Sequence, residues 1–278
     1  MPNNLPFKSI GIAGIGLIGG SFAKSFACKG IHIYGYDLSK EVLVQAAESG
    51  VFQGVTDDFE RFVNFPLDLI YICLPVKSAI NFINNLGKIK YSKAVTDACS
   101  TKSSILKAAS DNNLMFCGGH PIKGKEKSGF INADDDLYSG AKHIITSLGF
   151  FELDEKIKSL HELINMDVRQ MSGKEHDEIF AKVSHLPHFI SFCLMDTVLT
   201  QSKDALFYAG GGFRDFTRIA ASDAQMWSDI FFDNEEALIE CVENLEKDII
   251  KWKNMIKEGK AKELYSKIEQ VSEQRRKL

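Results

Sequence analysis

The sequence predicts an α/β protein, with a Rossmann-type doubly wound sheet followed by an all-helical C-terminal domain. Short apolar runs alternate with helix-like segments through the first part of the chain. The first run ends in a glycine turn, which is typical of a strand that leads directly into a helix. The alternation stops after Ser172, and the rest of the chain has only helical patterns. We therefore expect one domain over residues 1–172 and a second over residues 173–278.

Six apolar runs in the first part are predicted strands. They are apolar on both faces, as in a parallel sheet covered by helices, and right-handed crossovers then give an open doubly wound sheet. The predicted strands are Ile10–Ala13, Ile31–Tyr36, Leu69–Leu74, Ala94–Ala98, Met115–Gly118 and His143–Thr146. The predicted helices are Ser21–Cys28, Ser39–Glu48, Lys77–Leu86, Lys102–Ala109 and Phe151–Asn165, and a short return strand, Val168–Met171, follows.

The second part begins with a long predicted helix, Lys174–Leu199, with one apolar stripe. Pro187 should bend this helix, because proline cannot donate the hydrogen bond to the Val183 carbonyl. Between Leu238 and Ile256, apolar residues recur at alternating steps of four and three, which indicates a seam for another helix. The seam is either an intramolecular core stripe or a homodimer interface.

Composition excludes several classes of function. The 278 residues are 45% hydrophobic and 25% charged with a net charge of −4, which gives no basis for binding nucleic acid or a membrane surface. No secretory signal is visible, and the six cysteines form no CxxC pair. We therefore expect a cytoplasmic protein with reduced thiols and no metal site.

The glycine turn predicts a dinucleotide site. Gly14 permits the turn, Gly16 lets the backbone approach a pyrophosphate, and Gly19 lets the helix and strand pack closely. Asp37 follows the second strand at the offset where a carboxylate binds the ribose 2′-hydroxyl, which favours NAD over NADP, although Lys40 lies nearby. The predicted cofactor contacts in the turn are Gly14, Gly16, Leu17, Ile18 and Gly19.

Ligands of open parallel sheets bind at the carboxyl ends of the strands, so the residues after each strand are candidates for chemistry. His120 stands at the tip of the fifth predicted strand, two residues after Gly118, where a nicotinamide ring would lie. An imidazole there can take a proton from a hydroxyl as hydride leaves the same carbon. Ser100 could share this hydrogen-bond network, cap the helix that begins near Lys102, or do both.

Two patches of the second part are candidates for substrate binding. Ser184–His188 carries His185 and His188 beside the proline bend, without the third ligand that a metal site needs. The second patch is a triple glycine that includes Gly211, followed by Arg214, Asp215 and Arg218. Guanidinium groups suit bidentate carboxylate binding, and Asp215 can orient one of them. Together with the glycine turn and His120, these residues indicate a hydride-transfer enzyme for an anionic alcohol.

The motifs together resemble the prephenate dehydrogenase family of tyrosine biosynthesis. The resemblance runs from about Ile10 to about Leu238. The segments that carry it, in this order, are GIAGIGLIGGSFA, VTDACSTK, GGHPIKGKEKSGFINADDDLYSGAKHIIT, VSHLPH and GGGFRDFTRIAASDAQMWSDIF. It implies NAD-dependent oxidative decarboxylation of prephenate to 4-hydroxyphenylpyruvate, or of arogenate in the same family, by a homodimer.

The resemblance also implies roles for individual residues. His120 would take the proton of the ring hydroxyl with Ser100 orienting it, Arg218 would bind a substrate carboxylate, and His185 would position the substrate. Lys125 stands where several relatives have a small hydroxyl residue, so that a cation could contact the substrate side-chain carboxylate directly. The other implied site residues are Gly211, Asp215 and Trp227 at the pocket wall, Glu126 in a gating loop, and Leu74 and Pro75 beneath the cofactor.

Two other functions fit the same layout. A 3-hydroxyacid dehydrogenase also joins a Rossmann domain to a helical one, but it depends on a lysine in the helical domain. The candidates here, Lys174 and Lys182, lack a glycine-rich setting. An NAD-binding regulatory protein would not need His120, Ser100 and Arg218 together.

Overall fold

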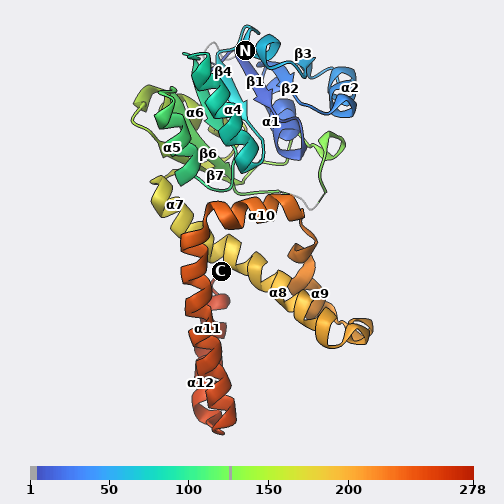
Figure 1. The fold of residues 1–278 in the computed structure, drawn as a ribbon, viewed down its shortest axis with the longest axis vertical. Coiled ribbons are helices and arrows are strands. Elements are labelled where there is room, and N and C mark those ends of the chain that lie inside the picture. The colour runs from blue at the N-terminus through green and yellow to red at the C-terminus, as the bar shows by residue number, and fades with distance from the viewer. Residues whose placement is uncertain (1–4, 125–126) are drawn as a thin grey trace.

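The computed structural model describes residues 5–124 and 127–278 and contains one eight-stranded sheet, in the order β3-β2-β1-β4-β5-β6-β7-β8 (Figure 1). The strands are β1 (Ser9–Ala13), β2 (His32–Tyr36), β3 (Phe52–Thr56), β4 (Leu69–Ile72), β5 (Ala94–Asp97), β6 (Phe116–Pro121), β7 (Lys142–Ser147) and β8 (Asp167–Gln170). The helices of this part are α1 (Leu17–Ala27), α2 (Lys40–Glu48), α3 (Phe59–Val63), α4 (Val76–Lys88), α5 (Ser103–Asp111) and α6 (Phe151–Glu162).

The predicted doubly wound sheet is confirmed, with two differences. β3 and α3 were not predicted, because Gln53 and Gly54 interrupt the apolar run of β3. In addition, β7 pairs antiparallel with β6, so the expectation that His143–Thr146 joins a parallel sheet is wrong. The described part of the β6–β7 connection holds only a 3₁₀ turn, Phe130–Asn132, and lacks the crossover helix that usually carries a chain to a parallel strand.

Helices cover both faces of the sheet. One core cluster joins the sheet to α1 and α6 through side chains such as Phe22, Phe26 and Leu160. A second cluster on the opposite face joins it to α3, α4 and α5 through Phe62, Ile83 and Ile105. Burial on both faces explains why the strands are continuous apolar runs. It also leaves the carboxyl edge of the sheet for polar residues.

The C-terminal part is helical throughout its described length. Its α-helices are α7 (Gly173–Phe180), α8 (Leu186–Gln201), α9 (Gly211–Thr217), α10 (Ala224–Asp233), α11 (Glu235–Lys257) and α12 (Ala261–Arg275). A π-helical turn, Ala181–His185, joins α7 to α8 immediately before Pro187. Proline lacks the N–H that a regular helix would use there, so the predicted interruption is confirmed as a π turn.

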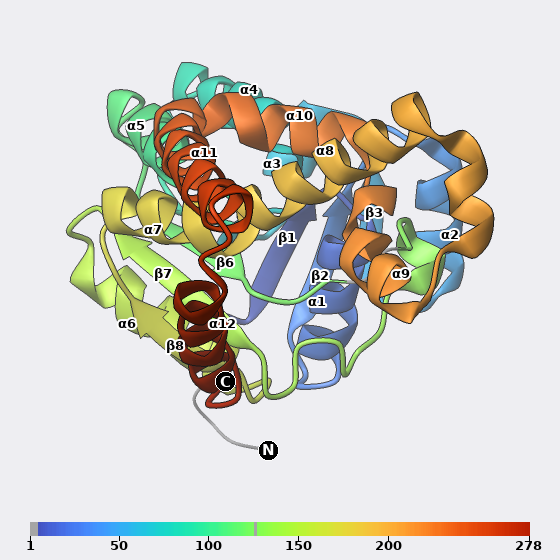
Figure 2. The same ribbon diagram turned by 90° about the horizontal axis from the view of Figure 1, so that it is seen from below.

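The apolar stripe expected along α7 and α8 is not the buried face. Val183 is exposed, whereas His176, Phe180 and His185 are buried. The buried face of α7 is in contact with α5 of the sheet domain and carries polar residues beside Phe180. The helical part contacts that domain mainly through α7 and α10. The helices α11 and α12 project away from the sheet domain in Figure 1, and Figure 2 shows the molecule from the side on which they project.

Two polar contacts anchor α10 to the sheet domain. Lys77 of α4 pairs with Asp229 at 2.7 Å, and the Ser104 hydroxyl of α5 donates to Asp233 at 2.7 Å. The helices of the described residues include none with the length and apolar composition needed to cross a bilayer.

Candidate active site

The glycine turn after β1 has the geometry that a bound pyrophosphate requires. Gly14 has a φ of +93°, which only glycine adopts readily. A Cβ on Gly19 would lie 2.0 Å from the Gly14 carbonyl oxygen, so Gly19 allows α1 to pack against the turn. A Cβ on Gly16 would meet nothing within 4 Å. The turn is therefore tight toward the protein and open at Gly16.

The first turn of α1 lies directly behind this opening. Gly16 is its N-cap residue and provides no side-chain cap, and Leu17 and Ile18 are its first two residues. The uncapped N–H groups and the helix dipole suit an anion. Asp37 lies at the end of β2, where its carboxylate accepts hydrogen bonds from the Ile15 N–H at 2.8 Å and the Ser39 N–H at 2.9 Å. These residues fit a dinucleotide.

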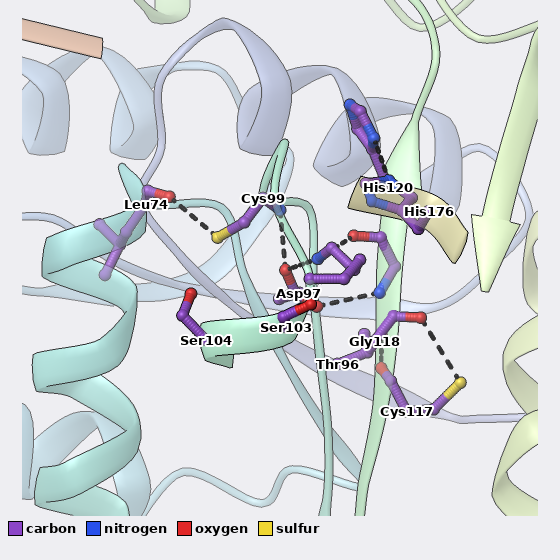
Figure 3. Close-up of polar contacts among 12 residues, drawn as sticks. Leu74, Thr96, Asp97, Cys99, Ser103, Ser104, Cys117, Gly118, His120 and His176 are labelled. Carbon is purple, nitrogen blue, oxygen red and sulfur yellow. Dashed lines mark hydrogen bonds and ion pairs between the residues drawn. The ribbon is translucent and has the colours of Figure 1, made fainter. Parts of the chain in front are cut away.

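Leu74 and Pro75 border the same turn. A Cβ on Gly14 would lie only 2.9 Å from the Leu74 side chain, and Pro75 is the N-cap residue of α4. The Leu74 carbonyl accepts a hydrogen bond from the Cys99 thiol at 3.5 Å (Figure 3). The loops after β1, β4 and β5 therefore meet at one point of the sheet edge.

A buried ion pair fixes the end of β6. Lys102 and Asp97 are both fully buried, and the Lys102 ammonium contacts Asp97 and donates to the Gly119 carbonyl at 2.7 Å. The Asp97 carboxylate also accepts from the Gly119 N–H at 2.9 Å (Figure 3). Buried charges persist only when they are paired and hydrogen-bonded, as here. The pair holds the backbone immediately before His120.

His120 is the penultimate residue of β6, and its ring lies beside that of His176 on α7. Its Nδ1 is 2.8 Å from His176 Nε2, and Phe180 packs against both rings. Burial, with His176, Lys102 and His185 nearby, lowers the pKa of His120 well below its ordinary value. The imidazole is therefore neutral at physiological pH, which is the state that can accept a proton.

Asp177 caps α5, which corrects one interpretation of Ser100. Its carboxylate accepts from the N–H groups of Lys102 and Ser103, each at 2.8 Å, and α5 begins at Ser103. Ser100 is therefore not the N-cap of this helix. Ser100 lies between β5 and α5, on the strand end next to that of His120, but the described partner of the His120 ring is His176.

His185 and Trp227 form a second polar group next to His176. The side-chain amide nitrogen of Asn234 donates to the Asp177 backbone carbonyl at 2.9 Å and to His185 Nδ1 at 3.1 Å. This leaves the proton of neutral His185 on Nε2. His185 Nε2 and Trp227 Nε1 are buried without a hydrogen-bond partner among the described residues. Buried donors without a partner are unusual inside a protein, and these two, on rings whose centroids lie 6.2 Å apart, indicate a place for a ligand.

The predicted site residues around the triple glycine lie on the segment between α8 and α10. Gly211, Arg214 and Asp215 belong to α9 and are exposed, and Arg214 Nε donates to the Ala209 carbonyl at 3.1 Å. Arg218 begins the 3₁₀ turn η4 (Arg218–Ala221), which packs against α8. The predicted site residues Lys125 and Glu126 lie outside the described residues.

Sequence reasoning missed His176, Asp177, Asp97, Lys102 and Asn234. One signal was available for Asp97, since a carboxylate within the predicted buried strand Ala94–Ala98 must have a buried partner. His176 and Asp177 lie next to each other in a polar helix, and nothing in their spacing indicates a site. Among the described residues there is no group of three or more side chains suited to hold a metal.

Comparison with known families agrees with this arrangement. Residues 22–167 match the nucleotide-binding domain of prephenate dehydrogenase, and residues 172–270 match the dimerization domain of the same family. Together the two matches cover most of the chain. The first contains the ends of β5 and β6, and the second begins just before α7.

Individual relatives give the same result. The chain is 31% identical to prephenate dehydrogenase of Bacillus subtilis over 91% of its own length and 71% of the relative, and 31% identical to cyclohexadienyl dehydrogenase of Zymomonas mobilis over 90% and 89%. Prephenate dehydrogenase of Aquifex aeolicus, solved with hydroxyphenyl propionate and NAD+, superimposes with a TM-score of 0.91 at 35% identity, covering 96% of this chain and 97% of that one. From these matches over most of its length, the chain belongs to the prephenate dehydrogenase family.

Proposed function

We propose that the protein catalyses the NAD+-dependent oxidative decarboxylation of prephenate to 4-hydroxyphenylpyruvate, a step of tyrosine biosynthesis. The observation that carries the proposal is the neutral His120 at the end of β6, at the same carboxyl edge of the sheet as the open glycine turn after β1. A hydride-transfer site needs a proton acceptor beside the nicotinamide ring, and a neutral imidazole at this edge of the sheet supports giving that role to His120. Membership of the family supports the same reaction.

His120 is the proton acceptor in this proposal. NAD+ supplies the hydride acceptor when it is bound at the glycine turn. The imidazole takes the proton of the ring hydroxyl as the carbon–oxygen double bond forms. Loss of the ring carboxylate as CO2 then sends its electron pair into the ring and on to that oxygen, which recovers the proton from His120. The aromatic product provides the driving force.

The substrate is held from the helical side. His185 Nε2–H and Trp227 Nε1–H are buried donors without a described partner, so substrate oxygens would satisfy both. Arg218 is the carboxylate anchor, because a guanidinium can bind both carboxylate oxygens at once. Ser100 contributes a hydroxyl near the same edge. Gly211, Arg214 and Asp215 shape the segment that carries Arg218.

Asp37 favours NAD+ over NADP+. Its carboxylate lies at the tip of β2 and would repel a 2′-phosphate, whereas it can accept a hydrogen bond from a ribose hydroxyl. Its hydrogen bonds to Ile15 and Ser39 hold it beside the glycine turn.

The active molecule is a homodimer in this proposal. An apolar groove of about 490 Å³ on α11 is lined by residues that include Leu245, Ile249, Trp252 and Ile256. Ile249 and Ile256 are more than half exposed, although they belong to the predicted seam. Exposed apolar surface of this kind marks interfaces. The match to a dimerization domain over residues 172–270 supports the second of the two alternatives for the seam.

Three further assignments belong to the proposal. The division between the cofactor domain and the helical domain lies near Ser172. The six cysteines are all free thiols, which suits a cytoplasmic protein. A lysine-dependent 3-hydroxyacid dehydrogenase is disfavoured, because Lys174 and Lys182 are exposed and Lys102 is engaged by Asp97.

Turnover measured by NADH absorbance tests the proposed reaction. We expect signal with prephenate plus NAD+, and we expect a lower kcat/KM with NADP+. Arogenate is the matched alternative substrate, since it replaces only the side-chain keto group by an ammonium group, and 3-hydroxyisobutyrate represents the lysine-dependent class. Absence of turnover with both prephenate and arogenate would refute the proposal.

A further inference from the structure

A chain of hydrogen bonds leads from His120 back into the helical part. His120 Nδ1 lies 2.8 Å from His176 Nε2, and His176 Nδ1 lies 2.8 Å from Asp177 Oδ1. The contact between the two rings crosses from β6 to α7 (Figure 3). Neither His176 nor Asp177 has a role in the reaction described above.

The direction of each bond follows from Asp177. Burial acts to raise the pKa of this carboxyl, but hydrogen bonds from His176, Ser103 and Lys102 outweigh it and hold the pKa below its ordinary value. Two of these donors are backbone N–H groups, which cannot accept. Asp177 is therefore an ionised acceptor, and the proton of the His176–Asp177 bond belongs to His176 Nδ1.

The same reasoning gives the direction of the hydrogen bond between His176 and His120. Burial lowers the pKa of His176, so its ring is neutral and carries a single proton, on Nδ1. His176 Nε2 then carries a lone pair and can only accept. The donor of the 2.8 Å hydrogen bond is therefore His120 Nδ1–H. His120 is neutral as well, so its Nε2 has no proton. The state of one histidine nitrogen is thus set by the hydrogen bond at the other.

We propose that His176 and Asp177 are positioning residues which hold His120 in its Nδ1–H tautomer, so that Nε2 presents a lone pair to the substrate hydroxyl. This inference rests on the proposed function. Without an acceptor at Nδ1, a neutral imidazole prefers the proton on Nε2, where it would point a hydrogen at the hydroxyl. A carboxylate that fixes a catalytic histidine tautomer through one intervening ring extends the logic of the serine-protease triad.

The fixed tautomer also serves the charged state of His120. When Nε2 takes the substrate proton, Nδ1–H still donates to His176, and no other proton has to move. The positive charge then forms a few ångströms from His176, whose own proton is bound to an ionised carboxylate. Return of the proton to the product oxygen restores the starting tautomer, so the arrangement is ready for the next turnover.

Two variants of His176 separate positioning from packing. His176→Leu fills the space without an acceptor, whereas His176→Gln places an amide oxygen near the former Nε2. We expect His176→Leu to lower kcat by about 10²-fold with KM changed less than about twofold, because a general base in the wrong tautomer loses most of its effect. His176→Gln should recover at least about tenfold of that loss. Equal kcat in His176→Leu and the wild type would overturn the proposal.

The tautomer can be read directly in the absence of turnover. In protein labelled with ¹⁵N-histidine, His120 should show a protonated Nδ1 and an unprotonated Nε2 at neutral pH, with its signals identified by their loss in His120→Asn. Since this chain has seven histidines, the spectrum is tractable. A protonated Nε2 in the wild-type protein would overturn the proposal whatever the activity. Failure to turn over prephenate or arogenate would instead refute the proposed function and leave this measurement standing.

Discussion

At the scale of single residues, burial makes His120 a usable base. A histidine on the surface would be partly protonated near neutral pH and could not accept a proton in that fraction of molecules. At the end of β6, burial and the neighbouring cationic and imidazole groups keep it neutral. The buried donors of His185 and Trp227 belong to the helical part. The base that we propose and these two donors thus come from different parts of the chain.

Replacement of His120 tests its role most directly. His120→Asn keeps a polar side chain but removes the basic nitrogen, so we expect kcat to fall roughly 10²- to 10⁴-fold. NAD+ affinity, measured by titration calorimetry, should remain near the wild-type value because the glycine turn is untouched. The contrasting variant is Arg218→Ala, which should mainly raise the KM for prephenate. A wild-type kcat in His120→Asn would remove this residue as the base.

At the scale of elements, the segment from β5 to α5 organises the site. Asp97 ends β5, Lys102 precedes α5, and together they hold Gly119 of β6. Asp177 of α7 caps α5 and also anchors His176. One short segment therefore connects the sheet edge to the helical domain.

The buried pair of Asp97 and Lys102 should be costly to break. Lys102→Met leaves the Asp97 carboxylate buried without its counter-ion, so we expect a loss of about 3–5 kcal/mol in the free energy of unfolding by urea. The matched control is Lys107→Met, which breaks the exposed pair with Asp111 and should cost less than about 1 kcal/mol. Equal losses in the two variants would show that the buried pair stabilises the fold no more than an exposed pair does.

At the scale of the whole molecule, several histidines are buried in a neutral state. Burial lowers the pKa of His161, and likewise of His185, to about 4. The unfolded chain binds more protons than the native state between about pH 6.5 and pH 4, so stability is fully present above this window and falls as pH falls through it. Each of the two histidines contributes up to about 3 kcal/mol by this linkage.

Unfolding measured across that window tests the linkage. His161→Gln should show a shallower fall in unfolding free energy between pH 6.5 and pH 4 than the wild type. His32→Gln is the control, since His32 is exposed on β2 and should leave the pH dependence unchanged. An identical slope in His161→Gln and the wild type would contradict the assignment of His161 as a buried neutral group.

The proposed dimer can be tested on the groove of α11. Ile249→Glu combined with Ile256→Glu places two carboxylates in the groove, and we expect this variant to be monomeric by light scattering. The wild type should have twice the chain mass of 31.0 kDa. Val44→Glu, which alters an exposed apolar residue on α2, should leave the mass unchanged. A monomeric wild type would refute the dimer.

The sequence alone determined the features that depend on local rules. A positive φ at Gly14 and the close approach at Gly19 require glycine, so the spacing of the glycines is enough to locate the turn. Buried parallel strands appear as apolar runs, and the residue after such a run lies at the ligand-binding edge, which identified His120. β3 was missed for the same reason, since Gln53 and Gly54 break the run.

Tertiary contacts determined the surroundings of that histidine. Along the sequence, His176 is 56 residues from His120. Asp177 is 75 residues from Lys102, which directly precedes the helix that Asp177 caps. Contacts over such distances have no period or spacing, because they arise from how a whole domain docks rather than from how a segment folds. Burial of these polar groups, and with it the protonation state and tautomer of His120, therefore exists only once the helical domain packs on the sheet edge.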